Sequence, residues 1–157
     1  MIKRETLFLK IAVVIIGLPI AAILAYLTYD LITVQKTKEF LLFIPMVVVL
    51  YLAAIPYFIA LYQTIKLLGY IDWKNAFSQL SVQALNIIKR CAVTISGLFI
   101  VDLPFLFHIA DVDDAPGIVL FSLIIIFASI VIAVFAAVLQ KLLTNALEIK
   151  SENDLTI

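Results

Sequence analysis

A single acidic residue interrupts a long apolar stretch in the second half of the sequence. Asp102 lies within residues 91–110, about 16 Å along a helix from the start of that stretch at a rise of ~1.5 Å per residue. A lone charge in hydrocarbon costs a few kcal/mol, so we expect this carboxyl group to be protonated, paired or in contact with water. Asp102 is therefore the candidate intramembrane proton or ion site.

A structural role for Asp102 is the alternative. Pro104 has no N–H group, so it leaves the carbonyl of Ile100 without its helical donor. A protonated Asp102 could bond to that freed acceptor, or to a tyrosine such as Tyr51 or Tyr57. The sequence offers no second intramembrane acid or base with which to form a proton relay. Both interpretations of Asp102 stay open at this point.

A group of metal-binding residue types follows this stretch, but its spacing does not match a known site. The group consists of His108, Asp111, Asp113 and Asp114. It lacks the spacing of a calcium loop, so we expect no metal site here. Residues 113–117 are better interpreted as a turn, with Asp114 capping the next helix and Pro116 in its first turn.

The sequence carries none of the common catalytic motifs. It has no phosphate-binding glycine loop, HExxH pair, GxSxG elbow or pair of intramembrane aspartates. Nothing beside its one histidine resembles an activated nucleophile. Its one cysteine, Cys91, excludes an intrachain disulfide, and either palmitoylation or burial as an inert thiol fits its position. We therefore expect a protein that is not an enzyme and has no cofactor.

The composition and the apolar runs indicate an integral membrane protein. Of the 157 residues, 65% are hydrophobic and 14% are charged, which leaves too little polar surface for a soluble domain. An apolar helix needs about 20 residues to cross roughly 30 Å of hydrocarbon. Runs of that size occur at about 11–29, 40–65, 91–110 and 118–139. Because the connections are short, we predict one all-α domain, a four-helix up-down bundle.

The basic residues predict how this bundle is oriented. Lys and Arg near span ends are retained on the cytoplasmic side of a membrane. If both termini and residues 66–90 are cytoplasmic, only Lys36 and Lys38 fall outside, whereas nine basic residues lie inside. We therefore expect a multi-pass membrane protein with cytoplasmic N- and C-termini. The formal net charge of zero gives no reason to expect direct nucleic acid binding.

The segment between the second and third spans has an amphipathic pattern. Within residues 72–89, apolar side chains recur at helical spacing among polar ones, namely Trp73, Phe77, Leu80, Ala84 and Ile88. We predict a short interfacial helix here, capped by Asp72. Its apolar face either lies in the inner headgroup region or serves as an interaction face for a cytosolic partner.

Two further patterns concern how the helices pack. Residues 10–20 and 90–100 agree at six of eleven positions, which suggests either two repeated helical hairpins or coincidence within a restricted alphabet. Small residues spaced four apart form one stripe on the first helix and one on the fourth. These stripes pack the bundle's own helices or form a homodimer face. They consist of Gly17, Ala21 and Ala25, and of Ser129, Ala133 and Ala137.

Four strings resemble one bacterial family over nearly the full chain. They are Thr6-Leu-Phe-Leu-Lys-Ile-Ala-Val13, Ala54-Ile-Pro-Tyr-Phe-Ile-Ala-Leu-Tyr62, Asp113-Asp-Ala-Pro-Gly117 and Ile149-Lys-Ser-Glu-Asn-Asp-Leu-Thr156. The family is the membrane-protein family called domain of unknown function 2975. The resemblance implies a four-helix plasma-membrane protein without assigned activity, often encoded beside a small helix-turn-helix regulator. It implies no catalytic residues.

These observations leave two functional hypotheses. The first is a non-enzymatic component for sensing, regulation or protection that acts through protein or lipid contacts. Its exposed features would be residues 66–90 and the tail 141–157, which we expect to be helical to about residue 150 and frayed beyond. Its partners would be the bilayer, a cytosolic regulatory protein such as the implied neighbour, or further copies of the chain. The alternative is a small oligomeric transporter or channel that uses Asp102.

Overall fold

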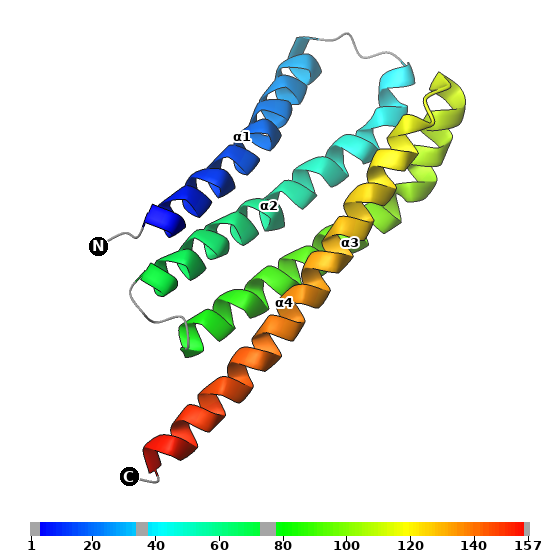
Figure 1. Cartoon of the computed structure of the whole chain (residues 1–157). Coiled ribbons are helices and arrows are strands. Elements are labelled where there is room, and N and C mark those ends of the chain that lie inside the picture. The colour runs from blue at the N-terminus through cyan, green and yellow to red at the C-terminus, as the bar shows by residue number, and fades with distance from the viewer. Residues whose placement is uncertain (1–3, 34–37, 73–77, 156–157) are drawn as a thin grey trace.

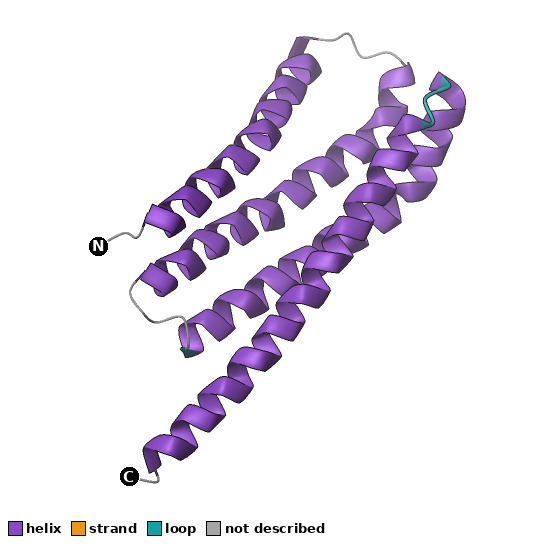
Figure 2. Ribbon diagram, viewed as in Figure 1, coloured by secondary structure: helices purple, strands orange, loops and turns teal. Residues whose placement is uncertain are grey.

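The computed structural model describes residues 4–33, 38–72 and 78–155, which form four long helices (Figures 1 and 2). In chain order these are α1 (Arg4–Thr33), α2 (Lys38–Asp72), α3 (Gln79–Asp113) and α4 (Gly117–Leu155). Each is long and apolar enough to cross a bilayer. Only a helix or a closed barrel satisfies the backbone inside hydrocarbon, which explains why such β-branched runs are helical here. The predicted all-α fold with four apolar helices is confirmed.

Consecutive helices run antiparallel and pack side by side (Figure 1). Among the described residues, backbone contacts join only helices that follow one another in the chain. Helix α3 thus lies between α2 and α4, whereas α1 contacts α2 alone and has the sparsest contact of the four. Lipid can cover the faces that remain open in such a row, because lipid tails are as apolar as these side chains.

The tightest contact is a regular seam between α3 and α4. Buried residues recur on both helices at alternating spacings of three and four, as in a coiled coil. We call the buried face of α4 and its contact on α3 the α3–α4 seam: Val119, Ser122, Ile126, Ser129, Ala133 and Ala136 on α4, which contacts only α3 among the described helices, and Phe99 on α3, which shares a buried cluster with Ile126. The serines and alanines on α4 let the two backbones approach closely.

The turn between α3 and α4 differs from the prediction. Asp114 was expected to cap α4, but it ends α3 instead, in the left-handed region with φ 50° and ψ 46°. Its backbone N–H donates to the carbonyl of Ala110, which satisfies one of the last free acceptors of α3. The N–H of Leu120 donates to the carbonyl of Pro116 at 3.3 Å, so α4 begins directly after the proline.

The predicted interfacial helix is not a separate element among the described residues. Helix α2 continues to Asp72, so Asp72 caps no later helix, and Ser78 caps α3 by accepting from the N–H of Ser81 at 3.4 Å. Residues 79–89 form the first turns of α3, because no proline or glycine interrupts them and α4 extends alongside to cover them. Trp73 and Phe77 lie outside the described residues.

The remaining residues of the predicted interaction face do not share one environment. Ala84 is buried, Ile88 is half-buried and Leu80 is exposed. The pattern that suggested an interfacial helix therefore serves in large part to bury α3 against its neighbours. A face for a partner, if present at this end of the molecule, is built by several helices.

The two small-residue stripes also differ from each other. Ser129 and Ala133 are buried in the α3–α4 seam and Ala137 is half-buried, so the stripe on α4 packs within the chain. On α1, Gly17 is buried, whereas Ala21 and Ala25 are exposed.

The two hairpins are packed differently. A Cβ on Gly17 would lie 2.9 Å from Cδ1 of Leu61 on α2, whereas a Cβ on the matched Gly97 would meet nothing within 4 Å. The α1–α2 pair is also the more loosely packed of the two hairpins. The sequence match between residues 10–20 and 90–100 therefore does not extend to the contacts these segments make.

Helix α4 is longer than predicted. It runs to Leu155 instead of fraying from residue 151, while residues 156–157 lie outside the described part. Its 39 residues correspond to about 58 Å, roughly twice the hydrocarbon thickness. Figure 1 shows its C-terminal end, in red, extending past the ends of the other helices.

Candidate functional site

Asp102 is the most deeply buried acidic residue among those described. It lies on α3, between α2 and α4, with 1% of its surface exposed. Phe99, three residues before it, forms a buried cluster with Ala53 of α2 and Ile126 of α4. Its Oδ1 atom is buried and makes no hydrogen bond with any described residue.

The partners expected for Asp102 from the sequence point elsewhere. The hydroxyl of Tyr57 donates to the carbonyl of Ile16 at 2.9 Å, and that of Tyr51 bonds with the hydroxyl of Thr28. Both tyrosines therefore join α2 to α1 and not to Asp102. They also supply polar contacts to the sparsest helix pair, where interhelical hydrogen bonds are worth about 0.6–2 kcal/mol each.

The carbonyl freed by Pro104 is not a partner for Asp102 either. Ile100 and Pro104 are both exposed, whereas Asp102 is buried. Two residues correspond to about 200° around a helix, so Asp102 faces away from both. The structural interpretation based on these acceptors is wrong.

A second buried polar atom without a partner among the described residues lies on α4. Ser122 is 3% exposed, and its Oγ makes no hydrogen bond with any described residue. Hydroxyl groups elsewhere in the helices behave differently. Thr64, Thr94 and Thr144 each donate to the carbonyl four residues earlier at 2.8 Å. Ser122 thus lacks the hydrogen bond to a carbonyl one turn earlier that hydroxyl groups in helices often make.

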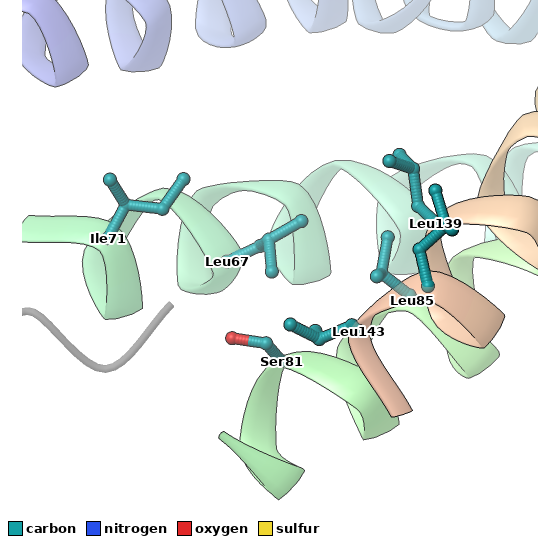
Figure 3. Close-up of a pocket in the computed structure, with 7 residues that line it drawn as sticks. Leu67, Ile71, Ser81, Leu85, Leu139 and Leu143 are labelled. Atoms are coloured by element: carbon teal, nitrogen blue, oxygen red, sulfur yellow. The ribbon is translucent and has the colours of Figure 1, made fainter. Parts of the chain in front are cut away.

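A separate candidate site lies near the end of α2 and the start of α3, where the second half of α4 passes beside them (Figure 3). It is an apolar pocket of about 270 Å³, which we call the terminal-end pocket. Figure 3 shows Leu67 and Ile71 of α2 opposite Ser81, Leu85 and Leu143. Its lining is Leu67, Ile71, Ser81, Leu85, Leu139, Leu142 and Leu143.

Each of the three helices carries a basic residue close to this pocket. On α2, Lys66 directly precedes the pocket residues, on α3 Lys89 and Arg90 follow them, and on α4 Lys141 lies among them. The Nζ of Lys89 donates to Oε1 of Gln140 at 3.2 Å, which ties α3 to α4 at this level. Basic side chains at span ends are typical of the membrane interface, so their positions predict that the pocket lies near that interface.

The structure gives little support to the two weaker candidate sites, the thiol of Cys91 and the group around His108. Cys91 is a buried free cysteine, which supports the inert thiol over palmitoylation. His108 and Asp111 are exposed. Within residues 4–33, 38–72 and 78–155, no group of three or more His, Cys, Asp and Glu residues is placed to hold a metal ion.

Sequence reasoning did not anticipate Ser122 or the terminal-end pocket. Ser122 and Ser129 are seven residues apart, and this heptad spacing could have assigned both to one seam. The pocket could not have been found in this way, because its residues come from three helices whose relative register the sequence does not state.

The four long apolar helices define a multi-pass membrane protein. The chain belongs to the family described as "Protein of unknown function (DUF2975)", which matches residues 2–157. It is similar to "Uncharacterized membrane protein YoaS" of Bacillus subtilis (strain 168), with 52% identity over 162 residues and 99% of each chain covered. No solved structure matches it. The family resemblance seen in the sequence is confirmed.

Proposed function

We propose that this protein is a non-enzymatic component of the bacterial plasma membrane that binds a cytosolic protein through the terminal-end pocket. The observation that supports this proposal is the pocket itself. It is apolar, three helices line it, and basic residues of the kind found at a membrane interface lie beside it. Apolar surface outside hydrocarbon is costly to leave open, and such patches on membrane-proximal surfaces serve as protein contacts. A sensing, regulatory or protective role would act through this contact.

The proposed orientation places the pocket in the cytoplasm. The start of α1, the end of α2, the start of α3 and the end of α4 lie at the same end of the row of helices (Figure 1). The excess of basic residues at this end supports a cytoplasmic location for it. A soluble regulator could then reach the pocket without crossing the membrane.

The lining and its surroundings favour a particular kind of partner. The pocket is almost entirely apolar, and the exposed Lys66 and Lys141 lie beside it. An amphipathic helix with an apolar anchor and acidic flanks would match both features. The exposed Ile149 and Leu155 on the extension of α4 offer further apolar contact. The helix-turn-helix regulator implied by the family resemblance is one candidate partner.

Site-specific photo-cross-linking in intact cells tests this role. A photoreactive residue at Leu142, which lines the pocket and is 59% exposed, is expected to form an adduct with a soluble protein. Ile71→Glu places a charge at the pocket rim and is expected to abolish this adduct, because an apolar anchor is then excluded.

The matched control uses the outer part of the same helix. Phe121 is 70% exposed on α4 but lies near the opposite end of the span. A photoreactive residue there is expected to label lipid alone. Lipid adducts alone at Leu142, or the same soluble adduct at both positions, would refute the proposed docking role.

A second candidate function is proton or cation transport through Asp102. It is favoured by one observation, the buried carboxyl oxygen without a protein partner. Intramembrane acids commonly mark ion pathways. Four helices in a row enclose no channel within one copy, so this function would also require assembly of several copies.

Flux measurements in proteoliposomes test the transport hypothesis. Asp102→Asn keeps the shape of the side chain but cannot carry a charge, so it is expected to reduce proton or Na⁺ flux to background. Asp111→Asn, at an exposed position on the same helix, is expected to leave the flux unchanged. Equal flux in the wild type and Asp102→Asn, or none in either, would eliminate transport through Asp102.

A further inference from the structure

A second apolar pocket, of about 550 Å³, lies between α1 and α2. We call it the α1–α2 pocket. Leu31 lines it from α1. Its lining on α2 is Phe43, Ile44, Val47, Val48, Tyr51 and Leu52. These two helices form the most loosely packed pair in the fold, and the docking role makes no use of the space between them.

Contacts between α1 and α2 bound one end of this pocket. A Cβ on Gly17 would lie 2.9 Å from Cδ1 of Leu61, so the two helices are close together at that level. Tyr51 is at the end of the lining nearer to this contact. Its hydroxyl bonds with the hydroxyl of Thr28 and donates to the carbonyl of Leu24 at 3.5 Å. These bonds hold α1 against α2, and the pocket extends from them toward the start of α2.

The pocket lies in the membrane-spanning part of α2. Its lining on that helix falls within the candidate span Phe43–Ile71. Ile44, Val48 and Leu52 are spaced four apart and are each exposed, so the pocket opens to the surroundings of the helices. From Ile44 to Leu52 it extends about 12 Å along the helix, compared with roughly 15 Å for the hydrocarbon of one leaflet. The pocket therefore follows α2 through most of one leaflet.

The chemistry of the lining selects an apolar occupant. Tyr51 is the one polar side chain among the lining residues, and its hydroxyl already bonds to α1. A buried water needs two to four polar partners, so water is not stabilised in this pocket. A polar ligand would lose its hydrogen bonds without replacement. Within a leaflet, the apolar molecules at hand are acyl chains and the helices of other proteins.

The dimensions of the pocket favour an acyl chain over a helix. Spread over about 12 Å, a volume of 550 Å³ corresponds to a space roughly 8 Å across. A helix with its side chains is about 10–12 Å wide, so a helix from a second copy does not fit inside. An extended hydrocarbon chain is narrower than a helix, and in a leaflet it lies along the direction in which α2 runs.

We propose that the α1–α2 pocket binds an acyl chain of a membrane phospholipid, which lies along α2 and fills the space beside Leu31. Lipid tails are as apolar as these side chains, so removal from water does not drive this binding. The gain is in dispersion, because an empty pocket leaves its lining without contact atoms and a chain restores them. Ile44, Val47 and Val48 are β-branched and strongly prefer one rotamer in a helix, so this wall keeps its shape. This inference does not rest on the docking role.

A bound chain would help to position α1. Helix α1 contacts α2 alone among the described helices. On the far side of the Tyr51 hydrogen bonds from Gly17, the chain would connect Leu31 to the wall of α2. The position of this end of α1 would then depend on the lipid that surrounds the protein.

Solid-state NMR tests the proposal on the wild-type protein, in phosphatidylglycerol vesicles with ¹³C-labelled acyl chains. Leu31 and Val47 are half-buried, yet their methyl groups are expected to give through-space cross-peaks with the chain methylenes. Leu61 is the matched control. It is also half-buried between α1 and α2 but packs at Gly17, so it is expected to give no such cross-peak. Silence at Leu31 and Val47, or equal cross-peaks at Leu61, would overturn the proposal.

A variant that fills the pocket gives an independent test. Val47→Trp is expected to abolish the cross-peaks between Leu31 and the chain, because the indole ring takes the place of the chain. Val101→Trp, at a 69% exposed position on α3, is expected to leave them unchanged. The contact between Gly17 and Leu61 lies outside the pocket and is expected to persist in both variants. Cross-peaks of Leu31 that survive Val47→Trp would refute the site.

The same method distinguishes two other occupants. Vesicles that contain a mixture of ¹³C-labelled and ¹⁵N-labelled copies report contacts between copies. Cross-peaks from Val47 to the other copy would mean that a second chain fills the pocket, and cross-peaks from Val47 to water would mean that it is hydrated. Either result, in place of cross-peaks to the acyl chain, would overturn the proposal.

Discussion

Replacing Ala133 with phenylalanine is expected to lower the free energy of unfolding by about 1–3 kcal/mol, the usual cost of overfilling a packed interior. Ala133 is 8% exposed and lies in the α3–α4 seam, where small side chains allow the two backbones to approach. A phenyl ring there must push α3 and α4 apart over much of the span. Equilibrium unfolding in mixed micelles with increasing denaturing detergent measures the loss.

The neighbouring residue offers a control at the same depth. Val134 is 57% exposed and points away from the seam. Val134→Phe adds a ring of the same size to the lipid-facing side, so its expected effect is within about 0.5 kcal/mol, as for other surface changes. Similar losses in both variants would show that Ala133 does not lie in a packed seam.

The substitution Gly17→Leu is expected to separate α1 from α2. A Cβ at Gly17 would lie 2.9 Å from Cδ1 of Leu61, and the three further carbons of a leucine side chain extend beyond that point, so they are expected to displace Leu61 from the α1–α2 contact. Because α1 contacts α2 alone among the described helices, no other contact holds it in place. The Tyr51 and Tyr57 hydrogen bonds would oppose the separation.

Distances between spin labels measure this separation. Labels at the exposed positions Ile11 of α1 and Tyr62 of α2, in a Cys91→Ser background, are expected to give a longer and broader distance distribution in Gly17→Leu. Gly97→Leu is the matched control, because a Cβ at Gly97 meets nothing within 4 Å. A distribution unchanged by Gly17→Leu, or broadened equally by both, would contradict the close α1–α2 contact.

Helix ends were less predictable than the existence of the helices. The apolar runs stopped at residues 65 and 139, yet α2 continues to Asp72 and α4 to Leu155. Hydropathy detects only the part of a helix that lies in hydrocarbon. Beyond that part, helical structure depends on contacts with neighbouring helices, such as the packing of residues 79–89 of α3 beside α4.

The partners of Asp102 could not be derived from the sequence. Tyrosine and proline positions offered plausible acceptors, but Tyr51 and Tyr57 face α1, and Ile100 lies on the opposite side of α3. Which neighbouring helix a given face contacts depends on how the helices are arranged in the fold. In a row of helices, α3 has two such neighbours, and nothing local in the sequence tells which side chains of α3 become buried between them.

By itself the sequence determined the class of this protein, its four helices and its family, because span length and composition respond to the bilayer and not to particular neighbours. It also singled out Asp102, since a charge in an apolar run is visible without a structure. Only the tertiary structure decided that α1 contacts α2 alone among the described helices and that Ser122 is buried on α4 without a hydrogen-bond partner among the described residues. It also decided that residues of three helices line one open pocket. In lipid the hydrophobic effect does not select among apolar faces, so side-chain shape and a few hydrogen bonds choose the neighbours.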